Sequence, residues 1–302
     1  MRVGVLAGFD EALVDALRRE VECNPSATWV DLKLGSTALD EVSPVDVLLD
    51  RASHENPFYA AWLRCAEDAG VRILNAPGRN RAGAPFADLV RVQRAGLPVA
   101  QAVLLPTKEY PAHLGASALT NLDFPLDWEA VWARVGPRAR LLPAIPMSML
   151  AGVEVRDVQG LLAAYDRSGQ TPAMVQSCVD GRRARAFWIG EQTVAVQCFE
   201  NDGLPRPDER GDEPTCELVR AAMQKVAAVL DLACAACDFT VTADEVVLTA
   251  VDTAAPEIDP ILMGEERFLS VVKALAQSLT AAPAAKSSPK QQKARSQRRK
   301  GA

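Results

Sequence analysis

Two cysteines three positions apart are the first residues whose type and spacing could support chemistry. Cys234 and Cys237 form a C-x-x-C motif, which serves redox exchange or metal binding in some proteins. A zinc site needs more ligands, and the sequence supplies no second such pair and only two histidines, His54 and His113. The seven cysteines lack the spacing of a disulfide framework. We expect reduced thiols that act as small buried apolar residues, with a redox or metal role for the pair as the alternative.

The remaining polar candidates do not form a recognised catalytic arrangement. His54 follows the end of an expected strand, where ligands often gather, although capping of a loop is the favoured interpretation. Asp244, Asp252 and Asp259 lie in separate segments, which fits an acidic surface exposed to water better than acid–base catalysis. The chain carries no Walker, H-E-x-x-H or Ser-His-Asp signature. Residue types alone therefore assign no reaction.

Strands and helices alternate in the first part of the chain, where they would position such residues. Short apolar runs predict strands, and apolar residues every three or four positions predict helices. The predicted strands span 1–6, 45–50 and 71–75, and the helices between them span 11–21 and 57–69. This order favours parallel pairing in an α/β lobe.

Helices and hairpins follow, which is typical of an α+β arrangement. Segments of period 2 at 184–189 and 192–199 flank Gly190-Glu191 and predict one hairpin. A second hairpin is expected from 239–241 and 246–251. Further strands are predicted at 102–105 and 173–179, and further helices at 86–95, 127–135, 158–165, 216–230 and 267–279.

The length and the distribution of apolar residues indicate a protein of several lobes without a membrane span. The 302 residues suffice for two or three compact lobes, and no apolar run approaches the ~20 residues that span a bilayer. The N-terminal apolar stretch is short and is followed by Asp10-Glu11, so no signal peptide is expected. We predict a cytoplasmic protein with no membrane span.

The C-terminal tail differs from the body in charge. The formal net charge is −6, and the segment from 283 onward contributes seven positive charges and no acid, which leaves −13 for the body. The basic residues are Lys286, Lys290, Lys293, Arg295, Arg298, Arg299 and Lys300. Its composition predicts a disordered tail that contacts nucleic acid, an anionic membrane or an acidic partner. A solubilising terminus, or one that folds back on the acidic body, is the alternative.

Five short strings occur along the chain in a characteristic order. They are DRASHENPFY at 50–59, LLPTKEYP at 104–111, FPLDWEAV at 124–131, AYDRSG at 164–169 and GEERF at 264–268. The ordered set resembles a bacterial ATP-grasp family related to glutathione synthetase and the ribosomal-protein glutamate ligases. The resemblance implies a Rossmann-like pre-ATP-grasp lobe and two α+β ATP-grasp lobes. Their expected ranges are 1–82, then 83–172 with the linker helix, then 173–280, before the tail at 281–302.

Several positions that hold ATP in that family are replaced in this chain. Two lysines normally bind the phosphates, and Pro85 and Leu142 stand at their places. The glycine-rich loop that should follow reads AIPMSM at 144–149, without glycine and with a backbone donor lost at Pro146. Ser177 replaces the acidic residue of the hinge that pairs with adenine. The resemblance thus implies a degenerate phosphate site.

Other positions keep the residue types that the family uses. Arg185 matches an arginine that reaches phosphate or substrate, and Gln176 matches the hinge residue beside adenine. Asp238 matches the first metal-binding acid, and Asp252 falls at or beside the second, where the expected Asn is absent. Arg140 could substitute for a phosphate lysine, although a solvent-facing arginine is the favoured interpretation.

These replacements favour a non-catalytic homologue that binds a peptide, a protein substrate, an active ATP-grasp relative or a second copy of itself. No cofactor is expected on this hypothesis. The alternative is an active ATP-dependent carboxylate–amine ligase, with ATP and Mg²⁺ held by Arg140, Arg185, Asp238 and Asp252. A third hypothesis is an adaptor whose basic tail docks on an acidic partner.

Overall fold

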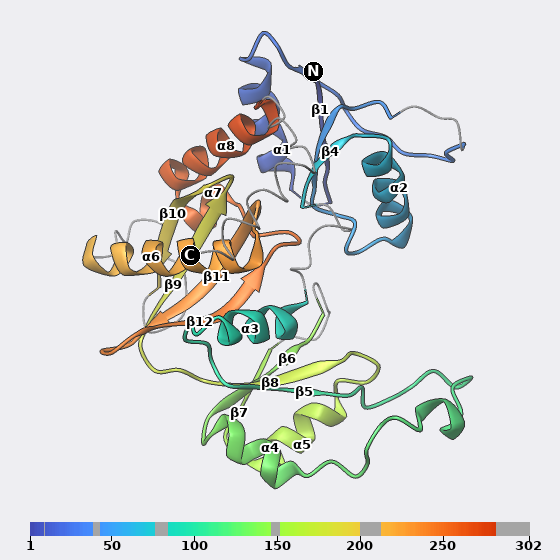
Figure 1. The fold of residues 1–302 in the computed structure, drawn as a ribbon, viewed down its shortest axis with the longest axis vertical. Helices are drawn as coiled ribbons and strands as arrows, with labels where there is room; N and C mark the ends of the chain where they lie inside the picture. Colours follow the sequence, from blue (N-terminus) through green and yellow to red (C-terminus); the bar gives the residue numbers. More distant parts are fainter. Residues whose placement is uncertain (9, 39–42, 76–83, 146–151, 200–212, 282–302) are drawn as a thin grey trace, which may run out of the picture.

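Residues 1–8, 10–38, 43–75, 84–145, 152–199 and 213–281 are described by the computed structural model. They form three four-stranded sheets with helices packed on them. Figure 1 shows the N-terminal sheet at one end of the molecule, a second sheet in the middle and a third at the other end. No helix in these ranges is long and apolar enough to cross a membrane.

Sheet A is the parallel sheet predicted for the N-terminal lobe. It contains β1 (Arg2–Leu6), β2 (Thr28–Trp29), β3 (Val47–Asp50) and β4 (Arg72–Leu74), in the order β2-β1-β3-β4. Helices α1 (Glu11–Glu22) and α2 (Pro57–Asp68) connect its strands. The apolar residues of β3 are buried on both faces, as expected for a covered parallel sheet. The predicted strand–helix order is confirmed, and the two-residue strand β2 was too short to predict.

Sheet B contains both predicted hairpins and is antiparallel. Its strands are β9 (Arg182–Ile189), β10 (Gln192–Cys198), β11 (Cys234–Val241) and β12 (Val246–Asp252), in the order β10-β9-β11-β12. One face packs against α6 (Glu213–Leu230) and α3 (Pro85–Arg94) in a shared apolar cluster. The other face packs against α8 (Glu265–Thr280), which follows the short helix α7 (Pro260–Met263).

Helix α8 joins sheets A and B into one packed body. Its buried residues share a single apolar cluster with α1, with β1 and β3, and with β9 and β11. Arg72 of β4 donates from Nη1 to the carbonyl of Ser278 at 2.8 Å and from Nη2 to that of Leu279 at 2.7 Å. These carbonyls lie in the last turn of α8 and have no partner within the helix, so Arg72 caps it.

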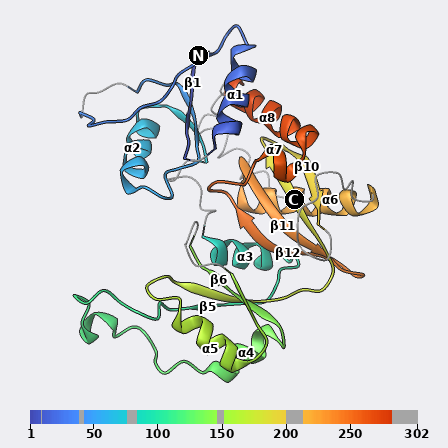
Figure 2. The same ribbon diagram turned by 180° about the vertical axis from the view of Figure 1, so that it is seen from behind.

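Sheet C lies at the opposite end of the molecule and is also antiparallel (Figure 2). It contains β5 (Ala102–Leu105), β6 (Ala139–Pro143), β7 (Val153–Val155) and β8 (Ala173–Ser177), in the order β5-β8-β6-β7. Helices α4 (Trp128–Val135) and α5 (Val158–Asp166) cover one face and form a separate apolar cluster with it. A short 3₁₀ helix, η1 (Ala116–Leu119), lies in the connection before α4. The other face of sheet C is turned toward α3 and sheet B.

Sheet C is attached to sheet B along strand β12. The amide of Ala100 donates to the carbonyl of Leu248 at 2.9 Å, and the amide of Leu248 donates to the carbonyl of Pro98 at 3.0 Å. The predicted lobe boundary at 173 precedes β8, although β8 pairs with β5 and β6 in sheet C. Helix α3, grouped by the prediction with the first ATP-grasp lobe, packs on β12 and α6 of the next one.

Candidate functional site

Three of the predicted site residues project from the same face of sheet B. Arg185 on β9 is the Cα partner of Asp238 on β11, and Ala236 on β11 is the partner of Asp252 on β12. Because side chains alternate along a strand, residues 236 and 238 share a face, and Arg185 and Asp252 share it with them. This is the face that packs against α8.

Arg185 and Asp238 form a two-point ion pair. Arg185 donates from Nε to Asp238 Oδ1 at 2.7 Å and from Nη2 to Oδ2 at 2.9 Å, and each side chain is 25% exposed. The other guanidinium nitrogen of Arg185, Nη1, lies 4.0 Å from Glu257 Oε2. The hydrogen bonds to Asp238 raise the pKa of Arg185 well above its ordinary value, so the guanidinium stays charged.

Asp252 is held by the backbone of the loop that follows β12. Its Oδ1 accepts hydrogen bonds from the amides of Ala254 and Ala255, both at 3.2 Å. Burial raises the pKa of Asp252, and these amides together with Arg185 and Arg51 partly offset the effect.

Asp238 and Asp252 do not form a ready-made Mg²⁺ site in the described structure. Both oxygens of Asp238 are engaged by Arg185, and the β12 residue opposite Asp238 is Ala250, which offers a methyl group. Magnesium prefers several oxygen ligands in octahedral geometry. Across the described ranges, no three His, Cys, Asp or Glu side chains gather into an all-protein metal site, and Mg²⁺ at a nucleotide site takes most of its ligands from phosphates and water.

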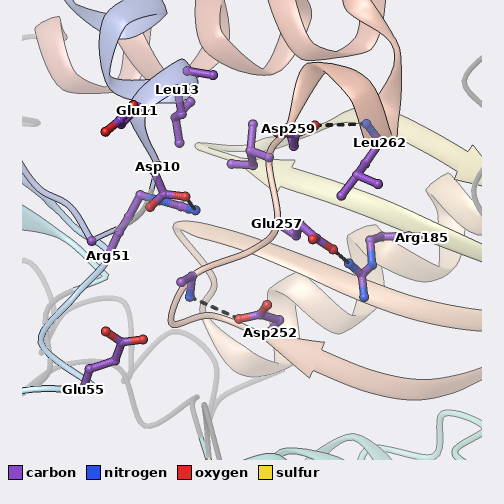
Figure 3. Close-up of a pocket in the computed structure, with 14 residues that line it drawn as sticks. Asp10, Glu11, Leu13, Arg51, Glu55, Arg185, Asp252, Glu257, Asp259 and Leu262 are labelled. Atoms are coloured by element: carbon purple, nitrogen blue, oxygen red, sulfur yellow. Dashed lines mark hydrogen bonds and ion pairs between the residues drawn. The ribbon is translucent and has the colours of Figure 1, made fainter. Parts of the chain in front are cut away.

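A pocket of about 500 Å³ opens between sheet A and this face of sheet B (Figure 3). Its walls combine carboxylates, two arginines and a few apolar side chains. The lining residues from the sheet A side include Asp10, Glu11, Leu13, Arg51 and Glu55, and those from the sheet B side include Arg185, Asp252, Glu257, Ile258, Asp259 and Leu262. The site is therefore shared between two lobes.

Arg51 joins the two walls of this pocket. Its side chain is only 1% exposed, and it donates from Nε and Nη2 to the carboxylate of Asp10, both at 2.8 Å. Nη2 also donates to the carbonyl of Pro256 at 3.0 Å, in the loop after β12. Sequence reasoning missed Asp10 and Arg51 as site residues. The available signal was the position of Arg51 directly after β3, at the carboxyl end of a parallel strand.

The predicted residues on sheet C lie on its face toward sheet B. Arg140 and Gln176 are Cα partners there, and Arg140 is exposed. The Gln176 amide is buried and donates from Nε2 to the carbonyl of Thr249 at 2.9 Å. The ladder between β11 and β12 is irregular at Thr249, which frees that carbonyl for Gln176. Through this hydrogen bond, Gln176 links sheet C to sheet B.

Leu142, at the place of the second lysine, takes part in an apolar contact. It packs against the cluster that contains Met174 of sheet C, Ala144 directly after β6, and residues of α3 and sheet B. Its Cδ2 also lies close over Gly152, where an added Cβ would be 2.8 Å away. The rest of the expected glycine-rich loop, at 146–151, lies outside the described residues.

The C-x-x-C cysteines do not face one another. Cys234 belongs to the apolar cluster on the α8 face of sheet B, and Cys237 belongs to the cluster on the α6 face. Burial raises the pKa of the Cys234 thiol to about 11 and also raises the pKa of Cys237. The pair therefore does not form a dithiol or a shared metal site. His54 Nε2 lies 3.9 Å from Glu55 Oε1, and His54 does not line the pocket.

Solved structures with similar folds share one architecture. A RimK-domain ATP-grasp protein from Sphaerobacter thermophilus DSM 20745 is 17% identical, with a TM-score of 0.69 over 93% of this chain and 100% of that chain. The ATP-grasp ligase PsnB, complexed with a minimal precursor, is 16% identical, with a TM-score of 0.62 over 92% and 98%. D-alanine–D-alanine ligase from Bacillus anthracis, complexed with ATP, is 12% identical, with a TM-score of 0.66 over 92% and 95%. The chain has the ATP-grasp fold.

This ATP-grasp fold confirms the predicted architecture, with a parallel N-terminal sheet followed by two antiparallel sheets. No protein-family model matches the sequence, and no curated protein matches it. At these identities the likeness shows the fold alone, so the roles of Arg140, Gln176, Arg185, Asp238 and Asp252 stay predictions.

Proposed function

We propose that this chain is a non-catalytic binding protein built on the ATP-grasp ligase fold. Its ligand on this proposal is a peptide or protein segment. The fold supports that choice, since the similar ligase PsnB is complexed with a precursor. The predicted cytoplasmic location is kept as part of the proposal.

The contact made by Leu142 carries this proposal. Phosphoryl chemistry depends on cations placed around the phosphates. The resemblance puts a lysine at Leu142, where the chain instead packs a branched apolar side chain against the apolar cluster between sheets B and C. A Leu at this place contributes to packing between sheets and offers no charge to a phosphate.

The Arg185–Asp238 pair supports the same proposal. In a working ATP-grasp site the arginine would face phosphate and the acid would face metal, so each would need to be available. Here the two side chains satisfy one another at 2.7 and 2.9 Å. Displacing them from this pair would cost part of the binding energy of any nucleotide.

Thermal stability with and without Mg-ATP tests the proposal. A ligand present at 100 times its dissociation constant stabilises the native state by about 2.7 kcal/mol, which raises the melting temperature visibly. We expect no rise at millimolar Mg-ATP. A clear rise that disappears in Asp238→Asn and Asp252→Asn would reject the proposal.

One observation favours a second candidate, the active carboxylate–amine ligase with an altered nucleotide site. Arg185, Asp238 and Asp252 converge on one face of sheet B beside an open pocket. If this candidate is right, the chain should release ADP from ATP in the presence of a carboxylate and an amine substrate. The Asp238→Asn variant would then lose that release while keeping its fold.

A further inference from the structure

The pocket between sheets A and B carries an excess of negative charge. Six of its lining side chains are carboxylates and two are guanidinium groups. Arg51 is neutralised by Asp10, and Arg185 is neutralised by Asp238, which lies outside the lining. Glu257 Oε2 makes a longer second contact with Arg185 Nη1 at 4.0 Å, and within the described residues the lining carboxylates without an arginine or lysine partner are those of Glu11, Glu55, Asp252 and Asp259. A cationic ligand complements this pocket.

We propose that this pocket binds a lysine or arginine side chain of a peptide. The inference rests on the proposed function and names the ligand class that the binding protein would take. Lysine and arginine join a long apolar stem to a charged head. The apolar side chains of Leu13, Ile258 and Leu262 match the stem, and carboxylates for the head lie on both walls, Glu55 on the sheet A side and Glu257 on the sheet B side. A volume of about 500 Å³ holds such a side chain together with a short stretch of backbone.

Arg51 supplies an independent sign that the ligand also brings a hydrogen-bond acceptor. This buried residue lines the pocket, and its Nη1 has no hydrogen-bond partner in the part of the chain that the structure describes. A buried donor without a partner is costly, typically about 1–3 kcal/mol. Nη1 is shielded from solvent in the described structure, so a peptide carbonyl oxygen would satisfy it only after a small shift of the pocket wall, whereas a bare metal cation would not satisfy it at all. The site thus suits a peptide with a basic side chain better than a free ion.

A peptide with basic side chains can come from two sources, a partner protein and the chain's own C-terminal segment. The segment from 282 to 302 contains seven Lys and Arg and no acid. Ala281, the last described residue before it, lies beside sheet A, since Arg72 Nη2 donates to the carbonyl of Ala281 at 3.2 Å. A segment of this length spans up to roughly 70 Å when extended, so distance does not exclude it from the pocket of the same molecule.

Fluorescence anisotropy with a labelled peptide of the sequence of residues 286–302 tests the site. The proteins are the full chain, a full-length variant with the seven tail Lys and Arg changed to Gln, and that variant carrying Glu55→Gln and Glu257→Gln. A matched control carries Glu217→Gln, which removes an exposed carboxylate from α6 on the other face of sheet B. A peptide with every Lys and Arg replaced by Gln controls for non-ionic binding.

We expect the labelled peptide to bind the tail-neutralised chain, and the paired change at Glu55 and Glu257 to weaken binding about tenfold. Glu217→Gln should change it less than about twofold. Weaker binding to the wild-type chain than to the tail-neutralised chain would identify the tail as the native occupant, and equal binding would identify a partner. Absence of binding, or equal weakening by Glu217→Gln, would overturn the inference. The Mg-ATP melting experiment tests the proposed function separately, so the proposed function and the proposed peptide site can be rejected independently.

Discussion

Replacing Arg185 by Gln should destabilise the protein more than replacing its partner Asp238 by Asn. An exposed ion pair contributes about 0–1 kcal/mol, and breaking a fully buried one costs about 3–5 kcal/mol. With each side chain 25% exposed, the pair lies between these limits, and we expect Arg185→Gln to cost about 2–3 kcal/mol. This change also removes the cation nearest to Asp252 and Glu257, which both raise the pKa of Arg185.

The partner substitution should cost less. After Asp238→Asn the guanidinium keeps two carboxylates nearby, so we expect a loss of about 1 kcal/mol. The double variant should lose less than the sum of the two single losses, because the second change removes a group that the first has already left without its partner. The non-additive part measures the coupling between the two side chains.

Urea unfolding followed by far-ultraviolet circular dichroism measures these losses, with the slope against urea checked for each variant. Arg138→Gln is the matched control, since Arg138 pairs with Asp180 at 2.5 Å on the surface. That variant should unfold at the wild-type midpoint. If Arg185→Gln unfolds like the wild type, or is more stable, the pair is not structural. Such a result would indicate side chains kept for a ligand at the expense of stability, as at many active sites.

Three more outcomes are expected. Because burial raises the folded-state pKa of Asp252, wild-type stability should fall as pH rises from the unfolded to the folded pKa. The Asp252→Asn variant should therefore melt higher than wild type at pH 7.5, with a difference that shrinks toward pH 4. Leu142→Lys should lower stability by about 2 kcal/mol, and Leu142→Met by under about 1.5 kcal/mol, in thermal unfolding. A thiol reagent should label exposed Cys65 in the native protein, but Cys234 and Cys237 only after unfolding.

Each of these has an outcome that contradicts it. If the difference in melting temperature between wild type and Asp252→Asn is constant from pH 4 to 7.5, titration of Asp252 does not cause the pH dependence of stability. A Leu142→Lys variant as stable as wild type would mean that the position is open to water. Rapid native labelling of Cys237 would contradict its burial in the cluster beneath α6.

Local signals in the sequence explain why much of the fold was predictable. Leu13, Leu17 and Val21 recur every four positions and form the buried stripe of α1. Gly190 has a φ of +67°, and it allows the turn between β9 and β10 that the flanking period-2 segments predicted. These features depend on residues close in sequence. The assignment of β8 to sheet C depended on a partner strand far along the chain, and period alone did not reveal it.

The sequence by itself determined the alternation of elements, the acidic body with its basic tail, and the residue types available for a site. Only the tertiary structure decided which of those residues meet. Arg185 and Asp238 are 53 positions apart, and Arg51 and Pro256 are 205 apart, yet each pair is in hydrogen-bond contact. Cys234 and Cys237 are close in sequence and end on opposite faces of a sheet. The physical reason is that contacts across sheets depend on strand register and on packing between lobes, which no local pattern specifies.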